Sequence, residues 1–381
     1  MARILFLEWN SFCNEYMKRA WKAKGDYVVS FPFSTKEDTR FDAELTKRIV
    51  MALLAQPFDY MFSFNYFPVA AMAAKACKIR YVSWVYDSPY AQLYSETVYY
   101  PTNDIRVFDS HEAAKLQKLG VSGISYFPLA ADTDYYDTFD SRKKPEYEAE
   151  VSFVGALYTD KRQQLYERFS ALPPYEKGYL DGVVEMQKQV YGSNLLENML
   201  TPDLLENMQK AVPLQPHPDA FATPAWYYAN FYLGRRVTSL ERTQLLTALA
   251  QKTALKVYTR DKNDVLSPCI CGPVDYYTQA PYVYKNSRIN LNITLKSIQT
   301  GIPLRVFDIM GCGGFLLTNY QEDMFAFFTP DEDFVYYTDE KDMLEKVDYY
   351  LRHDAQREKI AKNGYEKVKK FHTFHCRLDK L

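Results

Sequence analysis

The stretch TGIPLRVFD, residues 300–308, combines residue types that suit the binding of a phosphate group. Pro303 favours the first turn of a helix, because its missing N–H would be unpaired there in any case. Gly301 lets the backbone approach a ligand, and the free amides at a helix start bind anions. Arg305 then falls in the first turn, where the helix dipole disfavours a cation. A bound diphosphate would resolve that conflict; the alternative is a surface arginine that pairs with a nearby carboxylate.

A second candidate for phosphate binding is VGALYTDKR, residues 154–162. The pattern predicts a strand that ends at Val154, a turn at Gly155, and a helix that starts just after Lys161 and Arg162. This glycine and one of the two cations could hold a diphosphate from the side opposite the first stretch. Two solvated cations at a helix start are the alternative, and it is stronger for Lys161 than for Arg162.

The segment RINLNIT, residues 288–294, alternates apolar and polar residues as a half-buried strand does. A central parallel strand is normally apolar on both faces. The polar face, which includes Asn292, therefore belongs either to a sheet edge or to the wall of a ligand cleft. Its place directly before residue 300 favours the cleft, and Lys296 could then reach in.

In the first half, Asp87 directly follows the strand pattern of SWVYDSP, residues 83–89, and precedes a proline turn. A carboxylate placed there could deprotonate an acceptor hydroxyl. Aspartate before Ser-Pro is also a common turn residue that caps its own backbone. Both interpretations stay open.

Strand and helix patterns alternate along the chain, which is typical of parallel, doubly wound α/β sheets. The alternation predicts a first domain over 1–140, a charged linker over 141–150 and a second domain over 151–360. A proline-punctuated helical insertion is expected over 175–235. The last segment, 361–381, is expected to return as a helix toward the first domain. Ligands of such folds bind at the carboxyl ends of the strands, in a cleft between the two domains.

The glycines of GCGG, residues 311–314, are expected to shape the end of the helix that starts near residue 304. Gly311 would close that helix in the left-handed conformation, and Gly313 and Gly314 would let the chain turn into the next strand.

Composition narrows the possible functions. The chain has 381 residues, 47% hydrophobic and 25% charged, which suits two globular domains. A net charge of −2 does not indicate a protein that binds nucleic acid. Six cysteines without framework spacing indicate free thiols in the cytoplasm, and no segment is long and apolar enough to span a membrane. No Asp-x-Asp sequence is found in a loop suited to a metal, since DTD at 132–134 falls at the domain edge, so neither a metal nor a cofactor is expected.

The segment LRVFDIMGCGGFLLT, residues 304–318, resembles the spore-maturation-protein-type branch of the GT-B glycosyltransferases, and SWVYDSP is similar to that branch as well. The resemblance implies two Rossmann-like domains, with the nucleotide-sugar donor held by the second. It implies that Asp308 accepts the ribose hydroxyls and that the turn CGPVDYY, residues 271–277, holds the nucleobase through backbone contacts. The residue patterns above and this resemblance together give the expected donor-binding positions. They are Gly155, Lys161, Arg162, Gly272, Val274, Asn292, Lys296, Gly301, Ile302, Arg305 and Asp308.

The chain departs from the retaining enzymes of that class at one position. Thr300 stands where they carry an acidic residue. Thr300 and Asp87 are therefore the candidate catalytic positions, and the stereochemistry of transfer stays open.

These patterns predict a glycosyltransferase that moves a sugar from a nucleoside diphosphate donor, with a UDP-sugar favoured, to an unidentified acceptor. Two alternatives remain: a nucleotide-sugar epimerase of the same fold, and an inactive binding or scaffold subunit, which Thr300 keeps open. The expected partners are the donor and the acceptor, with an oligomer or partner contact possible through 175–235.

Overall fold

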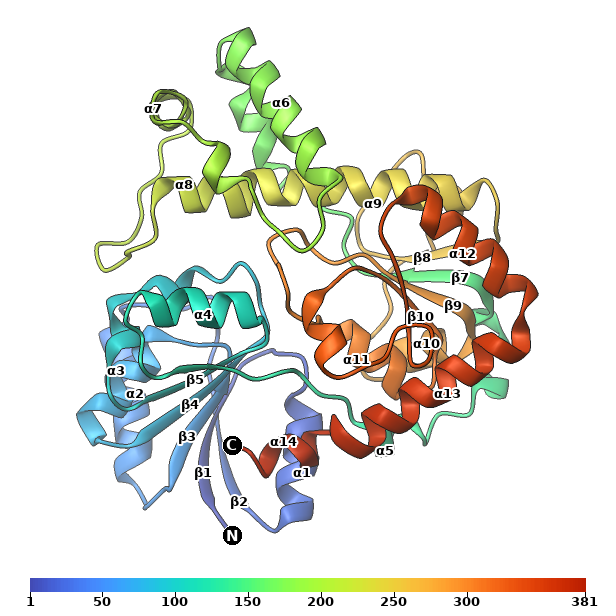
Figure 1. Cartoon of the computed structure of the whole chain (residues 1–381). Coiled ribbons are helices and arrows are strands. Elements are labelled where there is room, and N and C mark those ends of the chain that lie inside the picture. The colour runs from blue at the N-terminus through green and yellow to red at the C-terminus, as the bar shows by residue number, and fades with distance from the viewer.

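The computed structural model describes residues 1–381 and contains two parallel sheets (Figure 1). The first sheet has six strands in the order β2-β1-β3-β4-β5-β6, and the second has five in the order β11-β10-β9-β7-β8. The two doubly wound domains predicted from the sequence are confirmed. The strands of the first sheet are β1 (Arg3–Glu8), β2 (Tyr27–Pro32), β3 (Tyr60–Phe64), β4 (Arg80–Val85), β5 (Asn103–Val107) and β6 (Ile124–Tyr126). Those of the second are β7 (Ala149–Val154), β8 (Leu255–Tyr258), β9 (Ser287–Asn292), β10 (Leu316–Asn319) and β11 (Val335–Tyr337).

Helices cover both sheets. The first domain holds α1 (Asn14–Lys24), α2 (Ala43–Leu54), α3 (Pro68–Cys77), α4 (Ser110–Lys118) and α5 (Thr133–Tyr136). The second holds α9 (Gly234–Ala250), α10 (Ala280–Asn286), α11 (Leu304–Gly311), α12 (Glu340–Arg352) and α13 (Asp354–Phe371). Short 3₁₀ helices span Ala91–Tyr94, Glu96–Tyr99, Ser141–Lys143, Pro145–Tyr147, Leu165–Ala171, Glu197–Met199, Ser267–Cys269 and Glu322–Ala326. No helix is both long and apolar enough to span a bilayer.

The position of strand β9 excludes one of the two alternatives for its polar face, the sheet edge. This strand lies between β7 and β10, so its polar face is not at a sheet edge. That face is buried: Asn290 donates from Nδ2 to the carbonyl of Tyr284 at 3.0 Å and accepts from Ser152 Oγ at 3.1 Å. Internal hydrogen bonds therefore explain most of the polar alternation, because a buried amide must find partners.

The glycine cluster after α11 also differs from the expectation. Gly311 is the last residue of the helix rather than a left-handed cap, and Gly313 takes the positive φ of 75°. Gly311 is needed for another reason: a Cβ atom there would lie 2.7 Å from the Cβ of Ala131. The missing side chain lets the chain that crosses between the domains pack against α11.

The insertion leaves the second domain as an arm and returns across the first domain. It holds α6 (Pro174–Lys188), α7 (Pro202–Ala211) and α8 (Pro224–Tyr227), and a π-helical turn, Tyr228–Leu233, joins α8 to α9 in one long rod (Figure 1). The helix therefore runs through the expected boundary at residue 235. Residues 165–171 form a 3₁₀ helix where the pattern after Gly155 indicates an α-helix.

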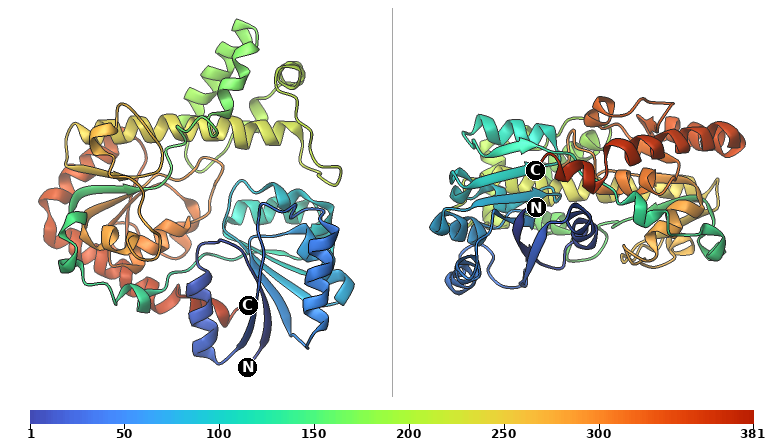
Figure 2. Two further views of the ribbon diagram at one scale, coloured as in Figure 1. Left: turned by 180° about the vertical axis from the view of Figure 1, so that it is seen from behind. Right: turned by 90° about the horizontal axis from the view of Figure 1, so that it is seen from below.

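The chain ends on the first domain. After α13, the short helix α14 (Phe374–Leu378) packs beside α1, and both chain ends lie on the same domain (Figures 1 and 2). Arg377 Nε donates to the carbonyl of Pro128 at 2.8 Å, and the ring of Phe374 lies 5.8 Å from that of Trp84. The returning segment is α14 alone, because α13 runs through the expected boundary at residue 361.

Candidate functional site

The carboxyl ends of β4 and β5 form the first-domain side of the candidate site. Val85 pairs with Val107 in the parallel register, so Asp87 and Asp109 follow at the same level on neighbouring strands. Gly301 of the second domain lies directly against Asp109: a Cβ atom at Gly301 would be 2.8 Å from the Asp109 Cα. The loop before α11 thus meets the first sheet one strand away from Asp87. We call this region the domain junction.

Hydrogen bonds cross the domain junction in both directions. Asp109 of the first domain accepts from Thr300 Oγ1 at 2.7 Å and from the Gln299 N–H at 2.9 Å. Asp323 of the second domain accepts from the Ser110 N–H at 3.1 Å. Thr300 is buried, and its hydroxyl also contacts Ser110 Oγ at 2.9 Å. The structure therefore places Thr300 in the contact between the domains, with its hydroxyl occupied.

The start of α11 offers several unpaired amides. The N–H groups of Thr300, Gly301, Ile302, Leu304 and Arg305 form no hydrogen bond within the protein. Free amides at a helix start, together with the helix dipole, suit an anion. Ile302 contributes only its backbone, because its side chain is fully buried in the core.

Arg305 lies beside this helix start, and two of the predicted donor residues hold it. Its Nη1 donates to Asn292 Oδ1 at 2.9 Å, and a Cβ atom at Gly155 would lie 2.7 Å from its Nη2. Asn292 in turn donates from Nδ2 to Thr318 Oγ1 at 2.9 Å, which fixes the amide. The ends of β7 and β9 and the start of α11 therefore bring Gly155, Asn292 and Arg305 together.

Arg242 is a second cation near this point that the sequence reasoning missed. It is buried in α9 and its Nε donates to the carbonyl of Ile293 at 3.2 Å. The guanidiniums of Arg242 and Arg305 lie 5.4 and 5.6 Å from the centre of the Phe153 ring. Burial, together with a smaller effect of the neighbouring Arg305, lowers the pKa of Arg242 to about 10. Arg242 lies far from the glycine-rich stretches in the sequence, and no local pattern marks it.

Asp308, the residue expected to bind the ribose, is almost completely buried. Its Oδ1 accepts from Tyr136 Oη at 2.7 Å and from Tyr276 Oη at 3.2 Å, while Oδ2 accepts no hydrogen bond. Burial raises the pKa of Asp308 to about 7. Tyr276 comes from the turn expected to hold the nucleobase, so the structure brings that turn and Asp308 together.

The nucleobase turn leaves the backbone groups of Val274 free. Gly272 adopts a φ of 81°, and its carbonyl accepts from the Thr259 N–H at 3.1 Å. The N–H and the carbonyl of Val274 form no hydrogen bond within the protein. An unpaired donor and acceptor on one residue match the edge of a nucleobase.

Three predicted donor residues lie outside this cluster. Lys161 and Arg162 are exposed in the segment that precedes the 3₁₀ helix, and neither side chain forms an ion pair. Lys296 is buried, and its Nζ lies 3.1 Å from Glu241 Oε1 and 3.6 Å from the centre of the Tyr191 ring. The expectation that Lys296 reaches the ligand is corrected, because its ammonium is occupied in a buried ion pair.

Asp87 lies exposed at the end of β4. Its Oδ2 accepts from Asn65 Nδ2 at 2.7 Å. Desolvation by the surrounding protein raises the pKa of Asp87, and the Asn65 hydrogen bond opposes that rise. An exposed carboxylate with a raised pKa at a domain junction suits a general base.

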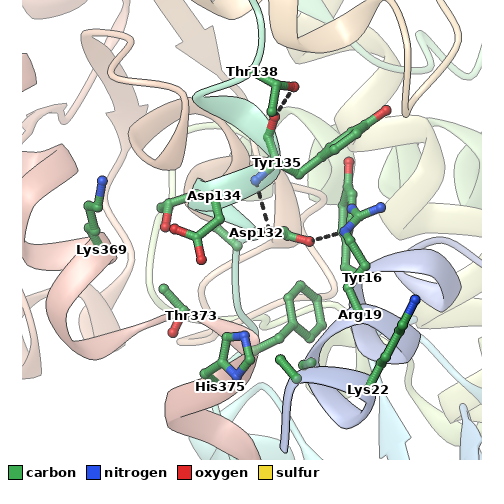
Figure 3. Close-up of a pocket in the computed structure, with 15 residues that line it drawn as sticks. Tyr16, Arg19, Lys22, Asp132, Asp134, Tyr135, Thr138, Lys369, Thr373 and His375 are labelled. Atoms are coloured by element: carbon green, nitrogen blue, oxygen red, sulfur yellow. Dashed lines mark hydrogen bonds and ion pairs between the residues drawn. The ribbon is translucent and has the colours of Figure 1, made fainter.

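A separate cavity of about 690 Å³ lies between α1, the segment 131–138 and the end of α13 (Figure 3). Arg19 Nε pairs with Asp132 Oδ2 at 2.8 Å beside Tyr16 and Tyr135 (Figure 3). None of the predicted site residues lines this cavity. No group of three or more His, Cys, Asp or Glu side chains is arranged to hold a metal ion.

Residues 242–381 match a family model described as "Glycosyl transferase-like". No curated protein matches the sequence. Among solved structures, sucrose-phosphate synthase from Thermosynechococcus elongatus is similar at a TM-score of 0.55 and 11% identity, over 100% of this chain and 98% of that chain. HepE from Anabaena in complex with UDP and glucose gives 0.53 and 10%, over 100% and 99%. A glycosyltransferase from Rickettsia africae gives 0.51 and 9%, over 100% and 96%.

The chain has the GT-B fold. At these identities the structural likeness establishes the architecture alone, and the family match is confined to residues 242–381 of the second domain. In this GT-B chain, Gly155, Asn292 and Arg305 lie together in the second domain, and Gly301 at the start of the same helix contacts Asp109 of the first domain. The spore-maturation branch stays a prediction.

Proposed function

We propose that this protein is a glycosyltransferase that moves a sugar from a nucleoside diphosphate-sugar to an acceptor hydroxyl. The observation that carries the proposal is the anion site at the start of α11, where unpaired amides meet a guanidinium held by Asn292. UDP is the favoured nucleotide, because HepE, which shares the fold, has a structure with UDP and glucose.

In the proposed reaction, Asp87 takes the proton of the acceptor hydroxyl, and the acceptor oxygen bonds to the anomeric carbon of the donor. The bond between that carbon and the diphosphate oxygen breaks, and its electron pair leaves with the diphosphate. The unpaired amides of residues 300–302, 304 and 305 and the charge of Arg305 would stabilise this developing charge. Arg242 would add positive potential without contacting the ligand, because its N–H groups bind backbone carbonyls.

The rest of the donor would lie along the second domain. The free N–H and carbonyl of Val274 would pair with the nucleobase, next to the left-handed Gly272. Asp308 Oδ2, which accepts no hydrogen bond in the protein, would face the ribose. Lys161 and Arg162 are exposed and would have to move toward the diphosphate to contribute.

We further propose that the transfer needs no metal and no cofactor, since Arg305 and the amides supply the positive charge. Activity should then survive treatment with EDTA and should not rise when Mg²⁺ or Mn²⁺ is added back.

Six unpaired cysteines, one of them exposed, support a cytoplasmic location as part of this proposal. The arm of α6 and α7, where Tyr175 is exposed, remains available for a partner contact.

Thermal unfolding with UDP, GDP, ADP, CMP and dTDP tests the donor site. A nucleotide at about a hundred times its dissociation constant should stabilise the protein by roughly 2.7 kcal/mol. Arg305→Ala should lose that shift, whereas Arg142→Ala, an exposed arginine in the linker, should keep it. If no nucleotide shifts the wild type, the protein is not a transferase of this kind. If UDP-sugar changes without any acceptor, the epimerase becomes the better assignment.

A further inference from the structure

Aromatic side chains cluster around Tyr86, the residue that precedes Asp87 on the first-domain side of the junction. Trp9 stacks on Tyr86 with ring centres 6.3 Å apart and planes 17° apart, and Phe12 also lies 6.3 Å from Tyr86. Phe12 lies 4.9 Å from Tyr276 of the second domain yet keeps 51% of its surface exposed. We call Trp9, Phe12 and Tyr86 the aromatic wall. Phe12 is more than half exposed and Trp9 and Tyr86 are partly exposed, so the wall is open to solvent between Asp87 and the turn at Tyr276.

Asn65 fixes the direction of Asp87. Its Nδ2 donates to Asp87 Oδ2 at 2.7 Å, and its Oδ1 accepts from the Tyr86 N–H at 3.1 Å. The side chain is 1% exposed, and the backbone adopts a left-handed φ of 59°, which asparagine tolerates better than most residues. Because both ends of the amide are occupied, Asp87 Oδ2 is held while Oδ1, which forms no hydrogen bond, stays free.

The aromatic wall and the donor site are adjacent. Asp87 follows β4, and Asp109, which touches Gly301, follows its paired neighbour β5. Trp9 and Asn65 follow β1 and β3, whose last paired residues include Leu7 and Ser63. A ligand at the Tyr86 end of the wall would therefore lie one strand away from the loop that carries the unpaired amides, whereas the Trp9 end follows β1, which β3 and β4 separate from β5. Direct transfer requires that closeness of acceptor and donor.

We infer that the aromatic wall binds the acceptor as a sugar ring, and that Asn65 is the positioning residue that holds Asp87 toward one of its hydroxyls. This inference rests on the proposed function and names its acceptor class. A sugar ring has a face of C–H groups and a rim of hydroxyls. The face packs on aromatic rings, and the rim donates hydrogen bonds to a carboxylate. The wall and the free Oδ1 of Asp87 offer both.

Tryptophan fluorescence gives a direct test of sugar binding. The chain has four tryptophans, and three of them are buried: Trp21 and Trp84 at 0% exposure and Trp226 at 4%. Trp9 alone is partly exposed. A panel of methyl glycosides titrated with saturating UDP should therefore give a saturable change in emission for at least one sugar. Trp9→Phe should abolish the signal, and Phe12→Ala should weaken binding at least tenfold.

The outcomes separate this inference from the proposed function. If UDP raises the melting temperature but no methyl glycoside changes the emission, the sugar acceptor is wrong and the donor site stands. If UDP does not bind at all, both fail. A saturable change that persists unaltered in Trp9→Phe would place the sugar elsewhere and also overturn the inference.

The role of Asn65 is tested with the sugar found in that titration. Asn65→Gly accepts the left-handed backbone but removes the amide that favours ionised Asp87. The acidic limb of the kcat/KM profile should then move up by roughly one pH unit, while KM for the UDP-sugar stays the same. Lys78→Gly, at another left-handed position far from the site, is the matched control. A uniform loss of activity with an unmoved acidic limb would show that Asn65 is only structural.

Discussion

Gly155 illustrates how closely the backbone and Arg305 approach each other. In Gly155→Ala, the new Cβ would lie 2.7 Å from Arg305 Nη2, so the guanidinium must move away from its bond to Asn292. The affinity for UDP should fall at least tenfold, as a thermal shift titration can measure, because the cation no longer lies beside the helix start. The φ of 159° at Gly155 also strains an alanine there, so the melting temperature of the unliganded variant is measured alongside the affinity.

Gly178→Ala provides the control for that substitution. Gly178 lies in α6 with open space around the position of a Cβ atom. Alanine there should stabilise the helix by roughly 0.5–1 kcal/mol and leave UDP affinity unchanged. Equal UDP affinity in both variants would mean that Arg305 does not contact the nucleotide.

Asp308 predicts a pH dependence of stability. Burial raises its pKa to about 7, whereas an unfolded carboxyl titrates near about 3.9. Between these values the folded protein binds a proton that the unfolded chain has released, so the free energy of unfolding falls as pH rises from about 4 to about 7. Asp308→Asn still accepts from Tyr136 but cannot ionise, and it should flatten this slope by at most about 1.4 kcal/mol per pH unit.

Urea unfolding at pH 5, 6 and 7 measures that slope. Glu112, whose pKa burial also raises to about 7, keeps a slope of the same sign in both proteins, so the informative quantity is the difference between wild type and Asp308→Asn. Identical slopes would show that the Asp308 carboxyl keeps an ordinary pKa.

Individual site residues could be predicted only in part. Gly301 and Arg305 sit beside a helix start that the sequence itself marks, and the ends of adjacent strands bring Gly155 and Asn292 to them. Lys296 and Thr300 looked equally suitable. Their partners, Glu241 and Asp109, lie 55 and 191 residues away in the chain, as the numbering shows, and no local pattern reveals such pairs.

The insertion contacts the first domain around Asp219. Asp219 Oδ1 lies 2.7 Å from Arg40 Nε of the first domain, and both side chains are only 11% exposed. Around it, Phe221 donates its N–H to the carbonyl of Tyr94, and Trp226 packs 4.3 Å from the Tyr94 ring. The segment thus fastens the second domain to the first.

Asp219→Ala should loosen this attachment. It leaves Arg40 with a nearly buried unpaired charge, so the free energy of unfolding should fall by roughly 3 kcal/mol. Limited proteolysis should then cut first in residues 212–223. Glu206→Ala removes an exposed partner of Lys210 on α7 and should change neither measurement. A similar cleavage pattern in both variants would contradict the fastening role.

Elements were easier to predict than their boundaries. Alternating strand and helix patterns give the two parallel sheets, because core strands need apolar residues whatever their neighbours. The rod from α8 to α9 runs through the expected boundary at residue 235, since its π-helical turn joins two helices without a capping residue. The 3₁₀ helix at 165–171 is fixed by packing of Tyr166 and Phe169 on the insertion, which no short pattern encodes.

On the scale of the whole molecule, Gly301 controls how closely the two domains meet. A Cβ atom at Gly301 would lie 2.8 Å from both Cα and Cβ of Asp109 and 2.9 Å from the carbonyl oxygen of Phe108. Backbone atoms cannot give way, so Gly301→Ala should push the domains apart, increase the radius of gyration in X-ray scattering and weaken UDP binding. An unchanged radius of gyration would show that the loop, and not the domain arrangement, absorbs the clash.

The position of α14 has a consequence for how the protein is made. Helix α14 completes the first domain by covering Trp84 and α1, although it follows the whole second domain in the sequence. A ribosome therefore releases β1 to β6 long before the helix that shields them, and the second domain can finish folding first. During synthesis, the first-formed sheet stays incomplete until α14 has been made, and it is the part of the nascent chain that a chaperone would need to protect.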